Sequence, residues 1–155
     1  MTQPAWQDDF ADQIFEMRRR MEETASARNL KRSPGGIVDI EFLAQMLQMK
    51  FAVESPNVMQ PGTIEALTEL KQAGHLDVQT AEELCDAYRF LRSVEARLRL
   101  MNTTARHDLP DDKAELDKLA YLFGASSGKV LAQQSRECMQ KNRACFNRLF
   151  SNHKM

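Results

Sequence analysis

The sequence predicts an all-α protein, an antiparallel up-down bundle of five to six helices. Apolar residues recur every three or four positions along most of the chain, which is typical of helices that bury one face. Valine and isoleucine are sparse, and no segment keeps the alternation of apolar and polar residues that a half-buried strand shows. The connections between the periodic segments are short, so consecutive helices are expected to pack side by side.

The first two predicted helices flank a glycine-rich turn. One helix is expected over about residues 4–27, and the arginine run Arg18–Arg20 near its end suits the helix dipole. We interpret this run as a solvated helix end. After the turn over residues 31–36, a second helix is expected over residues 37–53. It is apolar around most of its circumference, which predicts a central position in the fold.

Four further helices are expected over residues 63–73, 80–103, 113–123 and 129–152. Gly74 is a plausible stop for the first of these. The second carries a regular apolar seam of Leu84, Ala87, Leu91, Val94, Leu98 and Met101. The last is expected to bury Leu131, Cys138, Cys145 and Leu149, with Phe146 and Phe150 beside them.

Composition predicts one soluble, cytoplasmic helical domain over residues 1–155. Apolar residues make up 43% of the chain and charged residues 28%, as in ordinary globular proteins. The formal net charge of -1 argues against a nucleic-acid partner. No stretch approaches the roughly 18 apolar residues of a membrane span, and no secretory signal is visible, so no membrane partner is expected.

The chain has three cysteines and three histidines. We interpret Cys85, Cys138 and Cys145 as small apolar core residues in a reducing compartment. The histidines are scattered and share no ligand spacing with the cysteines, so no metal site is expected. His107 stands beside Asp108 in a predicted loop, where sequence neighbours rarely form a working pair, and no catalytic residue is predicted.

The turn before the second helix is the first candidate site. Lys31, Gly35 and Gly36 could contact a phosphate, because glycines expose backbone amides and a helix start is electropositive. The segment matches neither common nucleotide-binding glycine motif. The alternative is that Pro34 and the two glycines form only a turn.

Two acids at the start of the second helix form the second candidate site. Asp39 and Glu41 lie two positions apart, so in a helix they point about 200° away from each other and cannot chelate one ion together. Asp39 has a structural explanation, since a carboxylate in the first turn stabilises the free amides there. Glu41 needs a partner if it is buried. Either it pairs with an arginine such as Arg92, Arg97 or Arg99, or it faces a nucleotide or a neighbouring domain.

Residues 31–45, K-R-S-P-G-G-I-V-D-I-E-F-L-A-Q, resemble the signature K-x-x-x-G-G-I-x-[DE]-I-E-F-x-x-Q of the glutamine synthetase adenylyltransferases. In that family the signature opens the helical domain that follows each nucleotidyltransferase domain. The resemblance continues through Y-R-F-L-R-S-V-E-A-R-L at 88–98 and H-D-L-P at 107–110, and covers about residues 28–125. The P-G-G-I-V-D-I-E-F form is closer to the version after the second, C-terminal catalytic domain.

The resemblance implies a function for the parent enzyme. Such an enzyme transfers AMP from ATP to a tyrosine of glutamine synthetase and removes it by phosphorolysis, under control of the PII signal protein. Its catalytic domains carry a G-S motif and paired aspartates that bind Mg²⁺. This chain has neither, so it is expected to hold no cofactor and to be inactive alone. The related helical domain of PII uridylyltransferase, or a docking module without nucleotide contact, is the alternative.

The resemblance also implies roles for individual residues. Lys31, Gly35 and Gly36 would approach the nucleotide phosphates held by the catalytic domain. The expected polar network that fixes the central helix pair consists of Asp39, Glu41, Arg92, Glu95 and Arg99. The remaining surface would meet the nucleotidyltransferase domain, glutamine synthetase or the PII protein.

Overall fold

The computed structural model describes residues 5–7, 9–101 and 107–152. Its helices are α1 (Phe10–Glu22), α2 (Ile37–Phe51), α3 (Thr63–Gln72), α4 (Val78–Leu100), α5 (Lys113–Phe123) and α6 (Gly128–Asn152), with a 3-10 turn at Pro56–Val58. Within these residues the only β-type pairing is an isolated bridge between Asn29 and Asp108. The all-α prediction is confirmed.

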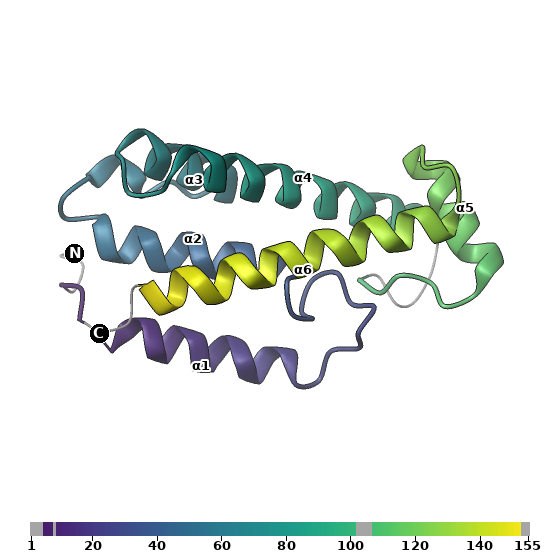
Figure 1. The fold of residues 1–155 in the computed structure, drawn as a ribbon, viewed down its shortest axis with the longest axis horizontal. Helices are drawn as coiled ribbons and strands as arrows, with labels where there is room; N and C mark the ends of the chain where they lie inside the picture. Colours follow the sequence, from purple (N-terminus) through teal and green to yellow (C-terminus); the bar gives the residue numbers. More distant parts are fainter. Residues whose placement is uncertain (1–4, 8, 102–106, 153–155) are drawn as a thin grey trace.

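The long helices lie along one common direction (Figure 1). α4 and α6 run in opposite directions along the bundle, and α5 lies across one end and packs against both. α2 contacts α1, α3, α4 and α6, so its predicted central position is confirmed. Within the described part of the chain, no helix is long and apolar enough to cross a membrane.

The core has two apolar clusters. The larger joins α1, α2, α3, the start of α4 and the end of α6, and the smaller joins the turn before α2 to α4, α5 and the first half of α6. Phe146 and Phe150 are fully buried and pack against Phe15. Cys138 and Cys145, which were expected in the core, are only half-buried, and burial raises the pKa of both thiols. Both cysteines pack against the apolar clusters from partly buried positions, whereas the two phenylalanines expected beside them are fully buried.

Several helix ends follow local sequence signals. The Asp77 carboxylate caps α4 by accepting a hydrogen bond from the Thr80 amide, and Asp112 caps α5 in the same way. Gly124 ends α5 in a left-handed conformation, φ 95°. The predicted bounds of α5 are confirmed, and α2, α3 and α6 differ from the prediction by one or two residues. α4 begins at Val78, two residues before the predicted start, and ends at Leu100 with Met101 as its C-cap, so it stops short of the predicted residue 103.

The first helix is much shorter than predicted. It begins at Phe10 and ends at Glu22, whereas residues 4–27 were expected. Residues 1–4 and 8 lie outside the described part of the chain. After Glu22 the chain turns to meet a distant segment: Leu109 donates its amide to the Arg28 carbonyl, and Leu30 donates its amide to the His107 carbonyl. Sequence periodicity carries no information about these long-range bonds, so it overestimated the helix.

Candidate functional site

The turn before α2 is closed by its own hydrogen bonds. The Asn29 side-chain oxygen accepts the amides of Lys31 and Arg32 at 3.0 and 2.7 Å. The Ile37 amide donates to the Leu30 carbonyl, and the Val38 amide donates to the Lys31 carbonyl. These bonds hold the Lys31 backbone at the start of α2.

Both glycines of the turn are required for close packing. Gly35 has φ 83°, and a Cβ there would lie 1.8 Å from the Met139 carbonyl oxygen on α6. A Cβ on Gly36 would lie 2.7 Å from the Leu30 and Lys31 carbonyl oxygens. The Asn142 amide also donates to the Gly35 carbonyl at 3.0 Å. Gly35 therefore lets the turn pack directly on the backbone of α6, and Gly36 lets the turn close on its own backbone.

The amides of these glycines are already engaged inside the chain. The Gly35 amide donates to Asp39 Oδ2 at 2.6 Å, and the Gly36 amide donates to the Ser33 carbonyl at 2.8 Å. Both residues are buried. A phosphate contact from either amide would require the turn to open. Of the predicted phosphate group, Lys31 is the member whose polar end has no hydrogen bond or ion pair to any described residue.

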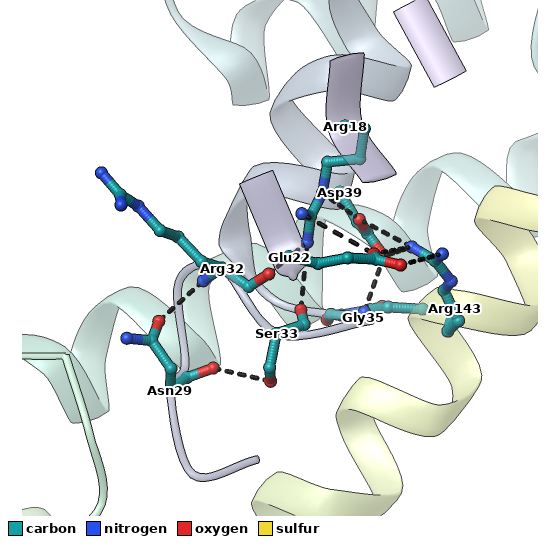
Figure 2. Close-up of polar contacts among 9 residues, drawn as sticks. Arg18, Glu22, Asn29, Arg32, Ser33, Gly35, Asp39 and Arg143 are labelled. Carbon is teal, nitrogen blue, oxygen red and sulfur yellow. Dashed lines mark hydrogen bonds and ion pairs between the residues drawn. The ribbon is translucent and has the colours of Figure 1, made fainter. Parts of the chain in front are cut away.

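Asp39 is the centre of a buried ion cluster (Figure 2). Its carboxylate accepts Arg18 Nε at 2.5 Å, Arg143 Nη1 at 3.2 Å and the Gly35 amide. Arg18 also donates to the carbonyls of the turn, Arg32 at 2.8 Å and Ser33 at 3.1 Å. The cluster ties α1, α2, α6 and the turn together.

This cluster corrects two predictions. Arg18 is not part of a solvated helix end, because its side chain is fully buried and meets Asp39. Asp39 is 1% exposed and has two arginine partners, so it does more than complement the dipole of α2. Glu22, 3.0 Å from Arg143, completes the group. The carboxylate of Asp39 is occupied by these donors.

A second ion cluster surrounds Glu95 on α4. Its side chain is 1% exposed, and its carboxylate lies 3.1 Å from Arg92 Nη1, 3.7 Å from Arg99 Nη2 and 2.8 Å from His107 Nδ1. Glu95, Arg92 and Arg99 were expected in one polar network, but the arginines were expected to pair with Glu41, and the contact with His107 was not predicted. The structure therefore divides the expected polar network into an Asp39 cluster and a Glu95 cluster.

Glu41 lies beside the second cluster but makes no hydrogen bond or ion pair with any residue in the described ranges. It is half-buried, and burial raises the pKa of its carboxyl, although the nearby charges of Arg92 and Lys31 act in the opposite direction. The predicted ion pair of Glu41 with Arg92, Arg97 or Arg99 is therefore absent from this part of the structure. Glu41, Lys31 and Arg92 form a polar surface at the junction of the turn, α2 and α4.

His107 links the second cluster to the turn. Its ring contacts Glu95, and its backbone carbonyl accepts the Leu30 amide at 2.7 Å. Arg28 reinforces the same junction by donating Nε to the Leu109 carbonyl at 3.2 Å. The H-D-L-P segment thus holds the residue that precedes Lys31.

Sequence reasoning missed Arg18, Glu22, Arg143 and the structural part that His107 plays. Arg143 lies on α6, outside the residues that carry the family resemblance, and 104 positions separate it from Asp39. One signal for Arg18 existed, since a buried Asp39 requires cationic partners from another element. Among the described residues, no group of three or more histidine, cysteine or acidic side chains could hold a metal ion.

Comparison with known proteins decides the family. The family model described as GlnD PII-uridylyltransferase matches residues 8–150. This chain belongs to that family. The two ion clusters and the signature turn all lie within the matched part, so they are features of a GlnD PII-uridylyltransferase family domain.

The curated relatives of this chain are named as glutamine synthetase adenylyltransferases, the family whose signature residues 31–45 resemble. The chain is 35% identical over 132 residues to a bifunctional glutamine synthetase adenylyltransferase/adenylyl-removing enzyme of Streptomyces coelicolor, covering 83% of this chain and 13% of that protein. A protein with the same name from Agrobacterium fabrum is 34% identical, over 79% of this chain and 12% of that protein. Another from Xanthomonas campestris is 37% identical, over 68% of this chain and 11% of that protein. The resemblance to the adenylyltransferases is confirmed. The chain spans about an eighth of the length of these relatives.

Proposed function

We propose that this chain is a non-catalytic helical domain of a glutamine synthetase adenylyltransferase and supports AMP transfer from ATP to glutamine synthetase in nitrogen regulation. The observation that carries the proposal is the match to bifunctional adenylyltransferases across residues that include the whole signature turn. In this proposal the reaction, the ATP and the Mg²⁺ belong to a nucleotidyltransferase domain of the same enzyme, and this domain docks against it.

Lys31 is the residue that we propose to approach the nucleotide. Its backbone is held by the Asn29 side chain and by the Val38 amide, so the position of its Cα is fixed by the fold. Its side chain is partly exposed beside Glu41, which has no partner of its own among the described residues. The fixed backbone therefore sets the region that the flexible side chain can reach, and its ammonium group provides a positive charge for a phosphate there.

Glu41 supports the same assignment. Its carboxylate is partly desolvated without a compensating bond, which lowers stability in the free domain. An acid that the packing leaves partly desolvated and unpaired is a candidate for a functional surface. We propose that Glu41 faces the nucleotide or the catalytic domain, where a hydrogen-bond donor would pair with its carboxylate.

A chimeric enzyme tests the proposed function. The matching segment of the Streptomyces coelicolor enzyme is replaced by this chain, and transfer of radiolabelled AMP to glutamine synthetase is measured. We expect transfer by the chimera and none by the isolated chain. Lys31→Ala in the chimera should lower kcat/KM for ATP about tenfold, or about 1.4 kcal/mol. Lys129→Ala, which changes an exposed lysine at the start of α6, is the matched control.

Two outcomes would contradict the proposal. AMP transfer by the isolated chain would show that it is itself an enzyme. Unchanged ATP kinetics in the Lys31→Ala chimera would remove the phosphate contact. Calorimetry of the chain with ATP–Mg²⁺, with glutamine synthetase and with the PII protein then separates a nucleotide contact from a docking module, and heat with the PII protein alone would favour the uridylyltransferase-like alternative.

A further inference from the structure

A cavity of about 490 Å³ lies next to the signature turn, away from Glu41 and Lys31. Its walls are formed by residues 27–34, by residues 109–111 with the start of α5, and by residues 132–143 of α6. Most of the wall is apolar, and the side chains include Leu30, Pro34, Leu109, Leu116, Ala132 and Met139. This size and this apolar lining are typical of small-molecule sites. On this side of α6 the lining comes from the segment between α1 and α2 and not from α1 itself, which ends at Glu22.

Most polar atoms in the walls are already satisfied. The Ser33 hydroxyl donates to the Asn29 carbonyl, and the Ser135 hydroxyl donates to the Leu131 carbonyl. Arg143 reaches the cavity but uses its terminal nitrogens on Asp39 and Glu22. None of these groups needs a ligand.

Two arginines at the cavity keep unused donors. Arg136 is exposed and makes no ion pair with any residue that the structure describes, and Arg28 uses only Nε, on the Leu109 carbonyl. Asp111 is the only acid in the described lining, against three arginines. An occupant with a negative group would therefore complement the wall, and arginine is well suited to bind a carboxylate.

We propose that this cavity binds a small organic carboxylate, with an apolar body between the turn and α6 and its carboxylate at Arg136 and Arg28. The inference does not rest on the proposed function, because it uses neither Lys31 nor the nucleotide. Its walls come from both the turn and α6, so an occupant would join the two segments and stabilise the folded chain.

The experiment uses octanoate as the probe, with octylammonium as the probe of opposite charge and equal apolar length. Thermal unfolding and calorimetry of the purified chain are recorded with each, after circular dichroism has verified its helix content. Octanoate should raise the Tm with a Kd of about 1 mM. Octylammonium should have no such effect.

Three variants separate this site from general binding. Arg136→Glu should weaken octanoate binding at least about fivefold. Ala132→Trp, which places a large side chain in the cavity, should abolish the binding. Arg89→Glu changes an exposed arginine on α4 outside the cavity and should bind as the wild type does.

No binding of octanoate up to about 10 mM would overturn the proposal, as would equal binding of octylammonium or unchanged binding by Arg136→Glu. If Ala132→Trp does not fold, the Arg136→Glu result decides alone, because that side chain is exposed and has no described partner. Loss of AMP transfer in the chimera would leave these results unaffected.

Discussion

Arg18 Nε on α1 lies 2.5 Å from Asp39 Oδ1 on α2, and neither side chain is more than 1% exposed. The pair joins the first helix to the acid of the signature, and Arg143 on α6 contacts the same carboxylate. A charge this deeply buried is tolerated only with such partners, so the pair restricts how α1, α2 and α6 can pack.

Asp39→Asn tests the importance of this cluster. The substitution removes the fully buried anion of the cluster and leaves the buried Arg18 with only Glu22 at 3.8 Å, whereas Arg143 keeps Glu22 at 3.0 Å. We therefore expect a loss of about 3 kcal/mol in the free energy of unfolding, measured with urea. Glu16→Gln breaks an exposed pair with Arg19, in which both side chains are 55% exposed, and should change stability by less than about 0.5 kcal/mol. Equal effects of the two substitutions would show that the buried cluster does not stabilise the fold.

Gly35→Ala tests the contact between the turn and α6. The new Cβ would meet the Met139 carbonyl oxygen, and the backbone at φ 83° already disfavours a side chain. We expect at least about 3 kcal/mol of destabilisation in thermal or chemical unfolding. Gly124→Ala is the control, because it has φ 95° but no atom within 4 Å of the added Cβ, and should lose only roughly 1 kcal/mol. Similar losses at both positions would mean that backbone conformation alone matters.

The link between Glu95 and His107 predicts an energetic coupling. A double-mutant cycle of Glu95→Gln and His107→Ala should give a coupling of about 0.5–3 kcal/mol in unfolding free energy, because the two side chains meet at 2.8 Å around a buried carboxylate. The same cycle on Asp86 and Arg89, an exposed pair at 3.7 Å, should give less than about 0.5 kcal/mol. Additive effects at Glu95 and His107 would contradict a structural link.

The partly buried carboxylate of Glu41 predicts that removing its charge stabilises the chain at neutral pH but not at low pH. Burial raises its pKa above the ordinary 4.5, so the folded chain holds this proton more tightly than the unfolded chain does. The unfavourable effect of the charged carboxylate is therefore fully present above the raised pKa and disappears as the pH falls below about 4.5. Glu41→Gln should be more stable than the wild type at pH 7 and equally stable near pH 4.

Urea unfolding across this pH range measures the effect at Glu41. Glu54→Gln, which neutralises an exposed acid just after α2, is the control for a general change in net charge. A gain that persists at low pH, or that Glu54→Gln reproduces, would contradict the explanation by burial.

The helices that follow local signals could be predicted from the sequence. α5 begins after the capping residue Asp112 and ends before Gly124, and both signals are readable in the chain itself. The central place of α2 also followed from its apolar circumference. The end of α1 could not be predicted, because the chain that follows it is held by backbone hydrogen bonds to a distant segment. The Leu30 amide donates to the His107 carbonyl, and the Leu109 amide donates to the Arg28 carbonyl, so each bond joins residues about 80 positions apart.

The candidate site shows the same division. The sequence alone determined the helical class, the glycine turn and the family, because periodicity, caps and an ordered signature are local properties of the chain. Only the tertiary structure decided that Arg18 and Arg143 meet Asp39, that Glu95 rather than Glu41 holds the arginines, and that the glycine amides are already occupied. The physical reason is that a buried charge is stabilised by whichever groups the packing brings within a few ångströms, and that proximity is not encoded in sequence separation.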